Sequence, residues 1–282
     1  MNTDTYPLLT IIIAVFNGDK TIQQCIDSVA LQSYPHKQLI IIDGGSTDDT
    51  VQLLQENNDV INYWVSEPDT GIYNAWNKGL IKANGEWVCF LGADDYLWNE
   101  HVLEEITSQL VNIPEDINIV YGQIMILTNN EVALYSIGES WDKIKTRFKQ
   151  LMCIPHQAVM HRKVLFEKNG LFDESFRIAG DYEWLLRELK TNNALFMPDL
   201  IITGMRQGGV SSDPSNTLTT MREIRRAQKM HGQSFPGWLW LMAMVRVHIR
   251  LFLCSLLGDQ TTKKILDRYR VIKGLPTYWT KI

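Results

Sequence analysis

The first 110 residues alternate between short apolar runs and longer amphipathic stretches, and this alternation constrains the fold more than any other feature. The runs are rich in β-branched residues and almost continuously apolar, as is typical of strands buried on both faces. The stretches between them carry apolar residues at helical spacing. Strands joined by helices in this way predict an α/β fold with a mostly parallel central sheet flanked by helices. The expected strands are 10–15, 38–42, 61–65 and 87–91, and the expected helices are 21–32, 47–56 and 72–83.

The rest of the chain divides into two regions. Residues 111–216 continue the same domain, and residues 217–282 are expected to form a helical, basic C-terminal extension. The extension holds 12 Lys or Arg against 3 acids, a net charge of +9, while the other 216 residues hold 15 Lys or Arg against 29 acids, a net charge of −14. In the middle region we expect strands at 117–121, 124–127 and 132–135, a helix at 143–152, and a helix that opens near Asp181.

Acidic residues follow three of the predicted strands. Asp43 ends the second strand, Asp69 comes shortly after the third, and Asp94 and Asp95 follow the fourth. In a parallel sheet these strand ends meet at one edge, where ligands bind. The alternative is that they are solvated loop acids, but three aligned strand ends favour a functional site.

The stretch DGGSTDDT, residues 43–50, contains both structural and functional signals. Ser46 is a good helix N-cap, and Asp49 stands where a capping box places an acid. No cap requires Asp43, which could accept an N–H of a nucleobase. The glycine pattern of dinucleotide-binding folds is absent.

Asp94 and Asp95 place two carboxylates side by side directly after a buried strand. A divalent cation such as Mg²⁺ or Mn²⁺ would relieve their repulsion, and carboxylate oxygens are the ligands that such hard cations prefer. The alternative is a cap on the helix expected near 99–110. A helix cap would account for only one of the two aspartates, so it does not explain the pair.

Five sequence blocks resemble family 2 glycosyltransferases with the GT-A fold, and most closely the bacterial enzymes that build lipid-linked polysaccharides. The resemblance covers about residues 7–212. It implies an inverting enzyme that moves a sugar from a nucleotide diphosphate sugar, with a UDP-sugar as the expected donor, to a saccharide acceptor, and that uses Mn²⁺ or Mg²⁺. Residues 1–110 would bind the nucleotide sugar, and residues 111–216 would hold the acceptor and the catalytic base. The blocks are TIIIAVFNG, IIIDGGSTDDT, EPDTGIYNAWNKGL, ANGEWVCFLGADD and IAGDYEWLLR.

The resemblance also implies roles for particular residues. Asp95 matches the metal ligand of the family's acidic pair, which reads A-D-D here, so the division of roles within the pair stays open. The residues expected to bind the nucleotide sugar are Ala14, Phe16, Asp43, Asp69, Tyr73, Asn77 and Asp94.

Asp181, in GDYEW, matches the family's catalytic base at a helix start. Displacement at an anomeric carbon needs a carboxylate to accept the proton of the attacking hydroxyl, a contribution of about 10²–10⁴ in rate. Capping of the helix is the structural alternative and is compatible with this role, because a helix N-terminus favours an ionised carboxylate. Glu183 is the second candidate for the base.

Weaker signals point to the acceptor side. His156 and Gln157 match a family block near the acceptor, although a histidine beside proline is as often a packed structural residue. Arg206 could close over the diphosphate, with a solvated loop arginine as the alternative. We expect His161 to be structural, and His231 is a remote candidate for the metal site.

The stretch 236–257 is apolar enough to span a membrane but contains Arg246 and Arg250. Each would cost about 2.5–3.5 kcal/mol at the centre of a bilayer. A helix that lies in the membrane interface fits better, with the basic residues up to Lys273 near anionic lipid. The alternatives are a core helix or a homodimer seam.

The N-terminus has no basic segment before its apolar run, so we expect no signal peptide. The cysteines share no close spacing, which argues against a zinc site and a disulfide framework. We therefore expect a cytoplasmic protein on the inner face of the plasma membrane, in peripheral contact through 236–273. Nucleic acid is not an expected partner, because the strand-end edge is acidic and no aromatic-basic binding module is present.

Two other functions remain open. A sugar-phosphate nucleotidyltransferase also combines an α/β sheet with paired acids and a metal, but it would require basic residues in a glycine-rich first loop, where only Lys20 is available. A non-catalytic scaffold on a glycosyltransferase fold would be expected to lack an acid, yet Asp43, Asp95 and Asp181 are all present.

Overall fold

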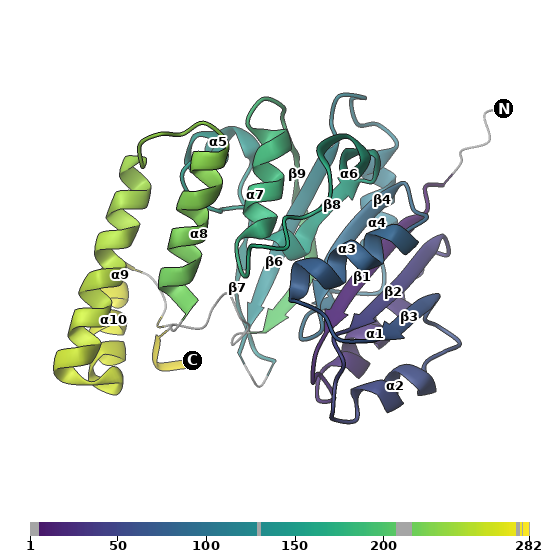
Figure 1. Ribbon diagram of the computed structural model, residues 1–282, viewed down its shortest axis with the longest axis horizontal. Coiled ribbons are helices and arrows are strands. Elements are labelled where there is room, and N and C mark those ends of the chain that lie inside the picture. The colour runs from purple at the N-terminus through teal and green to yellow at the C-terminus, as the bar shows by residue number, and fades with distance from the viewer. Residues whose placement is uncertain (1–5, 129–130, 207–215, 275–276, 278, 282) are drawn as a thin grey trace.

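The computed structural model describes residues 6–128, 131–206, 216–274, 277 and 279–281. Within them one continuous sheet of nine strands runs through both 1–110 and 111–216, in the order β3-β2-β1-β4-β8-β6-β9-β5 with β7 paired to β6 (Figure 1). The strands are β1 (Leu9–Val15), β2 (Lys37–Asp43), β3 (Tyr63–Ser66), β4 (Trp87–Gly92), β5 (Tyr96–Leu97), β6 (Ile119–Leu127), β7 (Ala133–Ile137), β8 (Val159–Arg162) and β9 (Leu195–Arg206).

Helices cover both faces of this sheet, as the sequence predicts. The helices are α1 (Ile22–Ala30), α2 (Thr50–Glu56), α3 (Ile72–Lys82), α4 (Val102–Leu110), α5 (Trp141–Phe148), α6 (Val164–Asn169), α7 (Gly180–Leu189), α8 (Thr217–Met230), α9 (Trp238–Leu257) and α10 (Asp259–Ile272).

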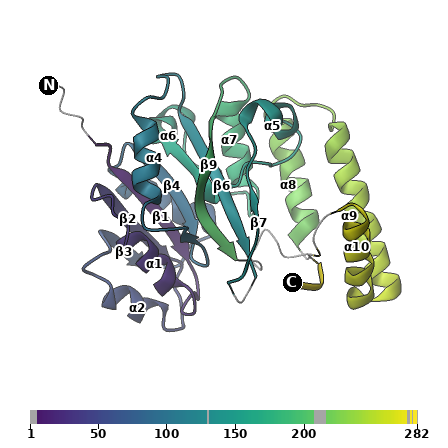
Figure 2. The same cartoon turned by 180° about the vertical axis from the view of Figure 1, so that it is seen from behind.

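The two-residue period of the strands divides the core in two. Ile12 faces one cluster, which includes residues of α3, α5 and α7, while Ile11 and Ile13 face the other, which includes residues of α1 and α4. Figure 1 shows α3 and α7 in front of the sheet, and Figure 2 shows α1 and α4 in front of its opposite face. The expected layers, with both faces covered, are confirmed.

The four N-terminal strands are parallel, so their carboxyl ends share an edge. β1 lies between β2 and β4, and Ala14 pairs with Ile42 on one side and with Gly92 on the other. β8 is antiparallel to β4, and β6 is antiparallel to β8 and parallel to β9.

Two predicted boundaries were wrong for identifiable reasons. The expected strands 117–121 and 124–127 form the single strand β6, because Gly122 sits at a register shift and does not end the strand. A Cβ on Gly122 would lie 2.7 Å from the carbonyl oxygen of Leu200, so this bulge requires glycine. The expected helix 47–56 begins only at Thr50, because the Ser46 hydroxyl bonds Asp43 and does not cap the helix.

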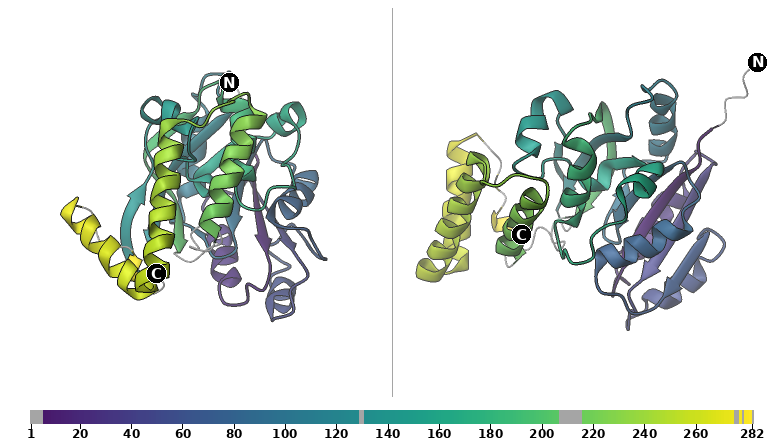
Figure 3. Two further views of the ribbon diagram at one scale, coloured as in Figure 1. Left: turned by 60° about the vertical axis from the view of Figure 1, so that its left-hand side comes forward. Right: turned by 45° about the horizontal axis from the view of Figure 1, so that its top comes forward.

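The C-terminal extension is helical, as expected. Figure 3 shows α8, α9 and α10 as a group on one side of the sheet domain. α9 packs against the domain through Trp240, Ala243, Met244 and Val247, and none of its residues is fully buried. Its length and composition would allow it to cross a membrane.

Replacement of Gly85 by alanine tests the packing at the start of β4. A Cβ there would lie 2.7 Å from the Leu8 oxygen and 2.7 Å from the Thr10 nitrogen, which are backbone atoms at the start of β1. We expect Gly85→Ala to lower the free energy of unfolding by about 1–3 kcal/mol in urea titrations. Asn84→Ala, at the exposed neighbouring position, is the matched control. Equal stabilities of the two variants would contradict this packing.

Candidate active site

The carboxyl ends of β1, β2 and β4 form the centre of the site. Val15 at the end of β1 pairs with Asp43 at the end of β2, while Asp94 and Asp95 follow β4 on the other side. Neighbouring strands lie about 4.8 Å apart, so Asp43 and the Asp94–Asp95 pair start about two strand spacings from each other. Phe16, directly after β1, is 65% exposed, and Ala14 is partly buried.

Asp43 is fully buried and has its own structural task. Its carboxylate accepts hydrogen bonds from the backbone N–H groups of Gly45 (3.2 Å) and Ser46 (3.0 Å), from the Ser66 hydroxyl (2.5 Å) and from the Ser46 hydroxyl. These donors fill the acceptor sites of a carboxylate. The argument that no structural task requires Asp43 was therefore wrong, because this side chain organises the loop after β2.

Asp69 lies against this same loop. A Cβ on Gly44 would lie 2.7 Å from the Asp69 Oδ2 atom, so glycine allows the close approach. The Asp69 Oδ1 atom accepts the backbone N–H of Gly71 at 2.9 Å, directly before α3. Asp69 thus connects the end of β2 to the start of the helix that carries Tyr73.

Asp94 and Asp95 crowd the end of β4. A Cβ on Gly92 would lie 2.7 Å from an Asp94 oxygen and 2.9 Å from an Asp95 oxygen. Asp95 is 3% exposed, and its carboxylate has a hydrogen bond with the Gly92 backbone. Burial raises the pKa of Asp95 well above its usual range, and the neighbouring Asp94 raises it further.

This pair is a chemically suitable cation site. A buried carboxylate beside a second carboxylate gains most from a bound cation. No cluster of three or more His, Cys, Asp or Glu side chains suited to a metal occurs in the described parts of the chain. The remaining ligands would have to come from substrate phosphates and water, which is how Mg²⁺ is commonly held.

Arg206, at the end of β9, lies beside this pair and not in a solvated loop. Its guanidinium donates to the Asp94 carbonyl oxygen at 2.6 Å and to Glu131 at 2.7 Å, and it also contacts Gln24. The side chain is 12% exposed. Arg206 therefore places a positive charge next to the acids.

Tyr73 connects Asp181 to the strand-end edge. Its hydroxyl accepts the backbone N–H of Gly180 at 2.8 Å, and lies 2.7 Å from the Ile178 carbonyl oxygen and 3.3 Å from the Asp181 Oδ1 atom. The ring is 3% exposed, so the contact is held by packing. Asp181 occupies the first turn of α7, as predicted, and remains partly exposed.

The surroundings of Asp181 raise its pKa to about 6, chiefly through burial. Hydrogen bonds from the Tyr182 backbone N–H and the Tyr73 hydroxyl oppose the rise. A carboxylate with this pKa is ionised at neutral pH and is a stronger base than an ordinary aspartate.

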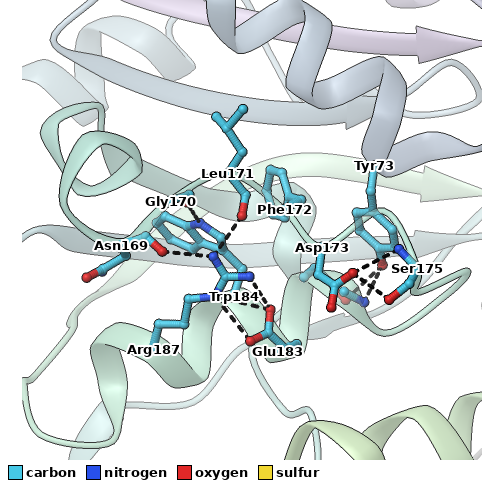
Figure 4. Close-up of polar contacts among 12 residues, drawn as sticks. Tyr73, Asn169, Gly170, Leu171, Phe172, Asp173, Ser175, Glu183, Trp184 and Arg187 are labelled. Carbon is cyan, nitrogen blue, oxygen red and sulfur yellow. Dashed lines mark hydrogen bonds and ion pairs between the residues drawn. The ribbon is translucent and has the colours of Figure 1, made fainter. Parts of the chain in front are cut away.

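Glu183, the second candidate for the base, is occupied elsewhere. It is 2% exposed and forms ion pairs with Arg187 at 2.6 Å and with His231 at 2.8 Å (Figure 4 shows the Arg187 contacts). Burial alone would raise the pKa of Glu183, but the bonds from His231 and Arg187 outweigh it and lower the pKa. The geometry thus leaves Glu183 structural and His231 outside the acidic cluster.

Three further predicted residues have mainly packing roles. Asn77 is 5% exposed, and its amide bonds the backbone of Phe172 in both directions (3.0 Å each) and the Glu174 side chain. His156 stacks on Phe90, and its Nε2 atom lies 3.2 Å from the His161 Nε2 atom. Burial lowers the pKa of His156 to about 3, so it is neutral. These buried contacts leave Asn77 away from a bound nucleotide sugar and His156 away from a bound saccharide acceptor. His161 is structural, as expected.

Gln157 is partly exposed. Its carbonyl oxygen accepts the Thr203 hydroxyl at 2.8 Å, and its side-chain amide contacts the Met205 sulfur at 3.7 Å.

Sequence reasoning missed Glu223, on α8. Its carboxylate accepts the consecutive backbone N–H groups of Arg177, Ile178 and Ala179, each at 2.8 Å. These residues lead directly into α7, so Glu223 holds the segment that positions Asp181. No local pattern predicts such a contact, because 46 residues separate Glu223 from Arg177.

Comparison with known proteins decides the family. A model described as glycosyl transferase family 2 matches residues 10–167, more than half of the chain. The chain belongs to glycosyl transferase family 2.

Relatives and solved structures agree with this family. A PGL/p-HBAD biosynthesis glycosyltransferase of Mycobacterium tuberculosis is 29% identical over 233 residues, which cover 78% of this chain and 84% of that protein. S. aureus TarS 1-349, solved in complex with UDP-GlcNAc, superposes with a TM-score of 0.62 at 18% identity over 93% of this chain and 72% of that one. The mannosyltransferase PcManGT from Pyrobaculum calidifontis, solved with GDP-Man and Mn²⁺, superposes with a TM-score of 0.62 at 15% identity over 97% and 83%. The GT-A-type fold predicted for this family 2 glycosyltransferase is thereby confirmed.

Variants of Glu223 test the support of the base segment. Glu223→Ala leaves three backbone N–H groups without their acceptor, which we expect to cost about 1–3 kcal/mol in the free energy of unfolding. Glu223→Gln keeps one acceptor oxygen and should retain more of the stability and of the transfer rate. The two variants are compared by urea unfolding and by turnover at saturating donor. Identical behaviour of the Ala and Gln variants would contradict a positioning role.

Proposed function

We propose that this glycosyltransferase moves a sugar from a nucleotide diphosphate sugar to a lipid-linked saccharide with inversion, in the biosynthesis of a cell-surface polysaccharide. One observation supports this most strongly. The Tyr73 hydroxyl ties the Asp181 segment to α3, whose start bonds Asp69 at the strand-end edge. A base and a set of donor-binding acids therefore belong to one contact network.

For the donor, we assign the nucleotide to the ends of β1 and β2. Phe16 offers an exposed ring for the base, beside Ala14. Asp43 would accept a base N–H after the Ser46 hydroxyl rotates away from it, and Asp69 would face the ribose or sugar. We propose a UDP-sugar, in line with the TarS complex with UDP-GlcNAc, while PcManGT was solved with GDP-Man.

For the cation, we assign Asp95 as the ligand. We assign the neighbouring Asp94 to the binding of the nucleotide sugar. A bound Mn²⁺ or Mg²⁺ would neutralise charge on the leaving diphosphate. Arg206 adds a fixed positive charge at the same place. The carboxylates hold and orient the donor, which contributes to the rate by fixing the geometry of attack.

Asp181 then accepts the proton of the attacking acceptor hydroxyl. Its partial exposure leaves it accessible to an acceptor. Its place in the first turn of α7 also favours the ionised carboxylate, because the helix N-terminus carries a partial positive charge. The attacking oxygen bonds the anomeric carbon as the bond to the diphosphate breaks, and the configuration inverts.

The C-terminal extension supports an acceptor that resides in a membrane. Exposed apolar side chains recur every three or four residues along one face of α9, opposite the face that packs on the domain. We propose that this face, together with the basic residues of 236–273, lies in the inner leaflet of the plasma membrane, with the enzyme in the cytoplasm. The exposed face comprises Trp238, Leu241, Val245, Ile249, Phe252 and Leu256.

Replacement of Asp181 by asparagine separates chemistry from donor binding. We expect Asp181→Asn to bind a UDP-sugar with Mn²⁺ normally and to lower transfer by at least about 10². Asp95→Ala is the contrasting variant and should lose the metal-dependent binding. In the wild type the transfer rate should rise with pH through about 6, because the ionised form of Asp181 is the base. Nucleoside diphosphate release measures transfer, and titration calorimetry measures binding of the UDP-sugar. Wild-type transfer by Asp181→Asn would refute the assignment.

The membrane face is tested by the double substitution Val245→Glu and Phe252→Glu. Both residues are exposed, so folding should be preserved, and each lost apolar contact with lipid is worth about 1.5–3 kcal/mol. We expect retention on anionic vesicles to fall by at least about tenfold in flotation assays. Val111→Glu with Val164→Glu, two exposed apolar positions outside the extension, is the matched control. Equal retention of both double variants would rule out this face.

A further inference from the structure

A basic groove lies between α8 and α9, away from the strand-end edge. Its volume is about 430 Å³, within the range of small-ligand sites. The floor is apolar, formed by Met230, Trp240 and Met244, and no acidic side chain lines it. Figure 3 shows α8 and α9 running side by side. The α8 wall carries four cations, Arg222, Arg225, Arg226 and Lys229.

The charge of this wall is largely uncompensated. Arg226 pairs with Asp173 at 3.4 Å, but among the described residues no carboxylate forms an ion pair with the other three cations, Arg222, Arg225 and Lys229. The Arg225 guanidinium is held by the backbone carbonyl oxygens of Gln233 (2.8 Å) and Ser234 (2.6 Å), which position it without cancelling its charge. Cations that share one wall and lack counter-charges favour an anionic occupant.

The groove adjoins the segment that positions the base. Arg226 donates to the Ser175 carbonyl oxygen at 3.2 Å, and its guanidinium lies 4.2 Å from the centre of the Phe176 ring. The following residues are those held by Glu223, one turn away on the same helix. A ligand in the groove would therefore bind next to the catalytic segment.

We propose that this groove binds the phosphate of the lipid-linked acceptor, with the first part of its hydrocarbon chain on Trp240 and Met244. This rests on the proposed function and adds the site that selects the lipid. The cations match the phosphate and the apolar floor matches the chain. The volume suits a phosphate and a short length of chain, and the rest of the lipid would leave the groove toward the membrane.

The test uses the full-length protein with Arg222→Gln and Lys229→Gln together, both at exposed positions, which removes two positive charges and leaves polar side chains. Retention is measured on phosphatidylcholine vesicles alone, with a polyprenyl phosphate, and with phosphatidylglycerol at the same mole fraction. We expect the wild type to prefer polyprenyl phosphate, and the double variant to lose about tenfold or more of that preference. Lys143→Gln with Lys190→Gln, which removes the same charge outside the groove, should keep it.

Several outcomes would overturn the proposal. Equal retention on phosphatidylglycerol would mean that bulk anionic lipid binds, and competition by inorganic phosphate would mean a soluble anion site. A shift in elution volume between wild type and variant would mean that a second copy of the chain covers the groove. Metal-dependent binding of UDP-sugars, measured on the same samples, tests the proposed function separately. Loss of the lipid preference in the double variant, with donor binding intact, supports the groove as the lipid site. Absence of donor binding in a wild type that keeps its lipid preference contradicts only the donor assignment.

Discussion

The site depends on the contact between the Tyr73 hydroxyl and residues 178–181. Tyr73 belongs to the N-terminal half of the sheet domain, whereas α7 belongs to the second half, and 105 residues separate Tyr73 from Ile178. The ring is fixed by edge contacts with Trp76 and by packing on Phe172, so the hydroxyl has little freedom. A buried hydroxyl without partners would be costly, and here one hydroxyl both accepts and donates. Asp181 and the acids at the strand ends are thus connected by packing and hydrogen bonds of the protein itself.

A second layer of support comes from α8. Glu223 satisfies three successive N–H groups ahead of α7, and the same helix carries the cations of the groove. The C-terminal extension therefore supports the segment that carries Asp181 and is also a candidate membrane contact.

The sequence was sufficient for the sheet and its edge, because unbroken apolar runs and helical spacing follow directly from burial on both faces. The strand-end rule likewise placed Asp43 and Asp95 at the edge. Prediction from the sequence failed where tertiary contacts decide the role of a residue or the extent of a strand. The segments 117–121 and 124–127 were taken as two strands but form one strand with a bulge at Gly122, and Asn77 and His156 were assigned to substrates although both are buried among packed groups. Glu223 carries no local signal at all, since its partners lie in a distant loop.

The most direct measurement is a crystal structure of the Asp181→Asn variant with a UDP-sugar and Mn²⁺. The account predicts the cation on Asp95 and the diphosphate, and the anomeric carbon turned toward residue 181 with room for one hydroxyl about 3–3.5 Å from the carbon. A donor bound on another surface, or one whose reactive carbon points away from α7, would contradict it.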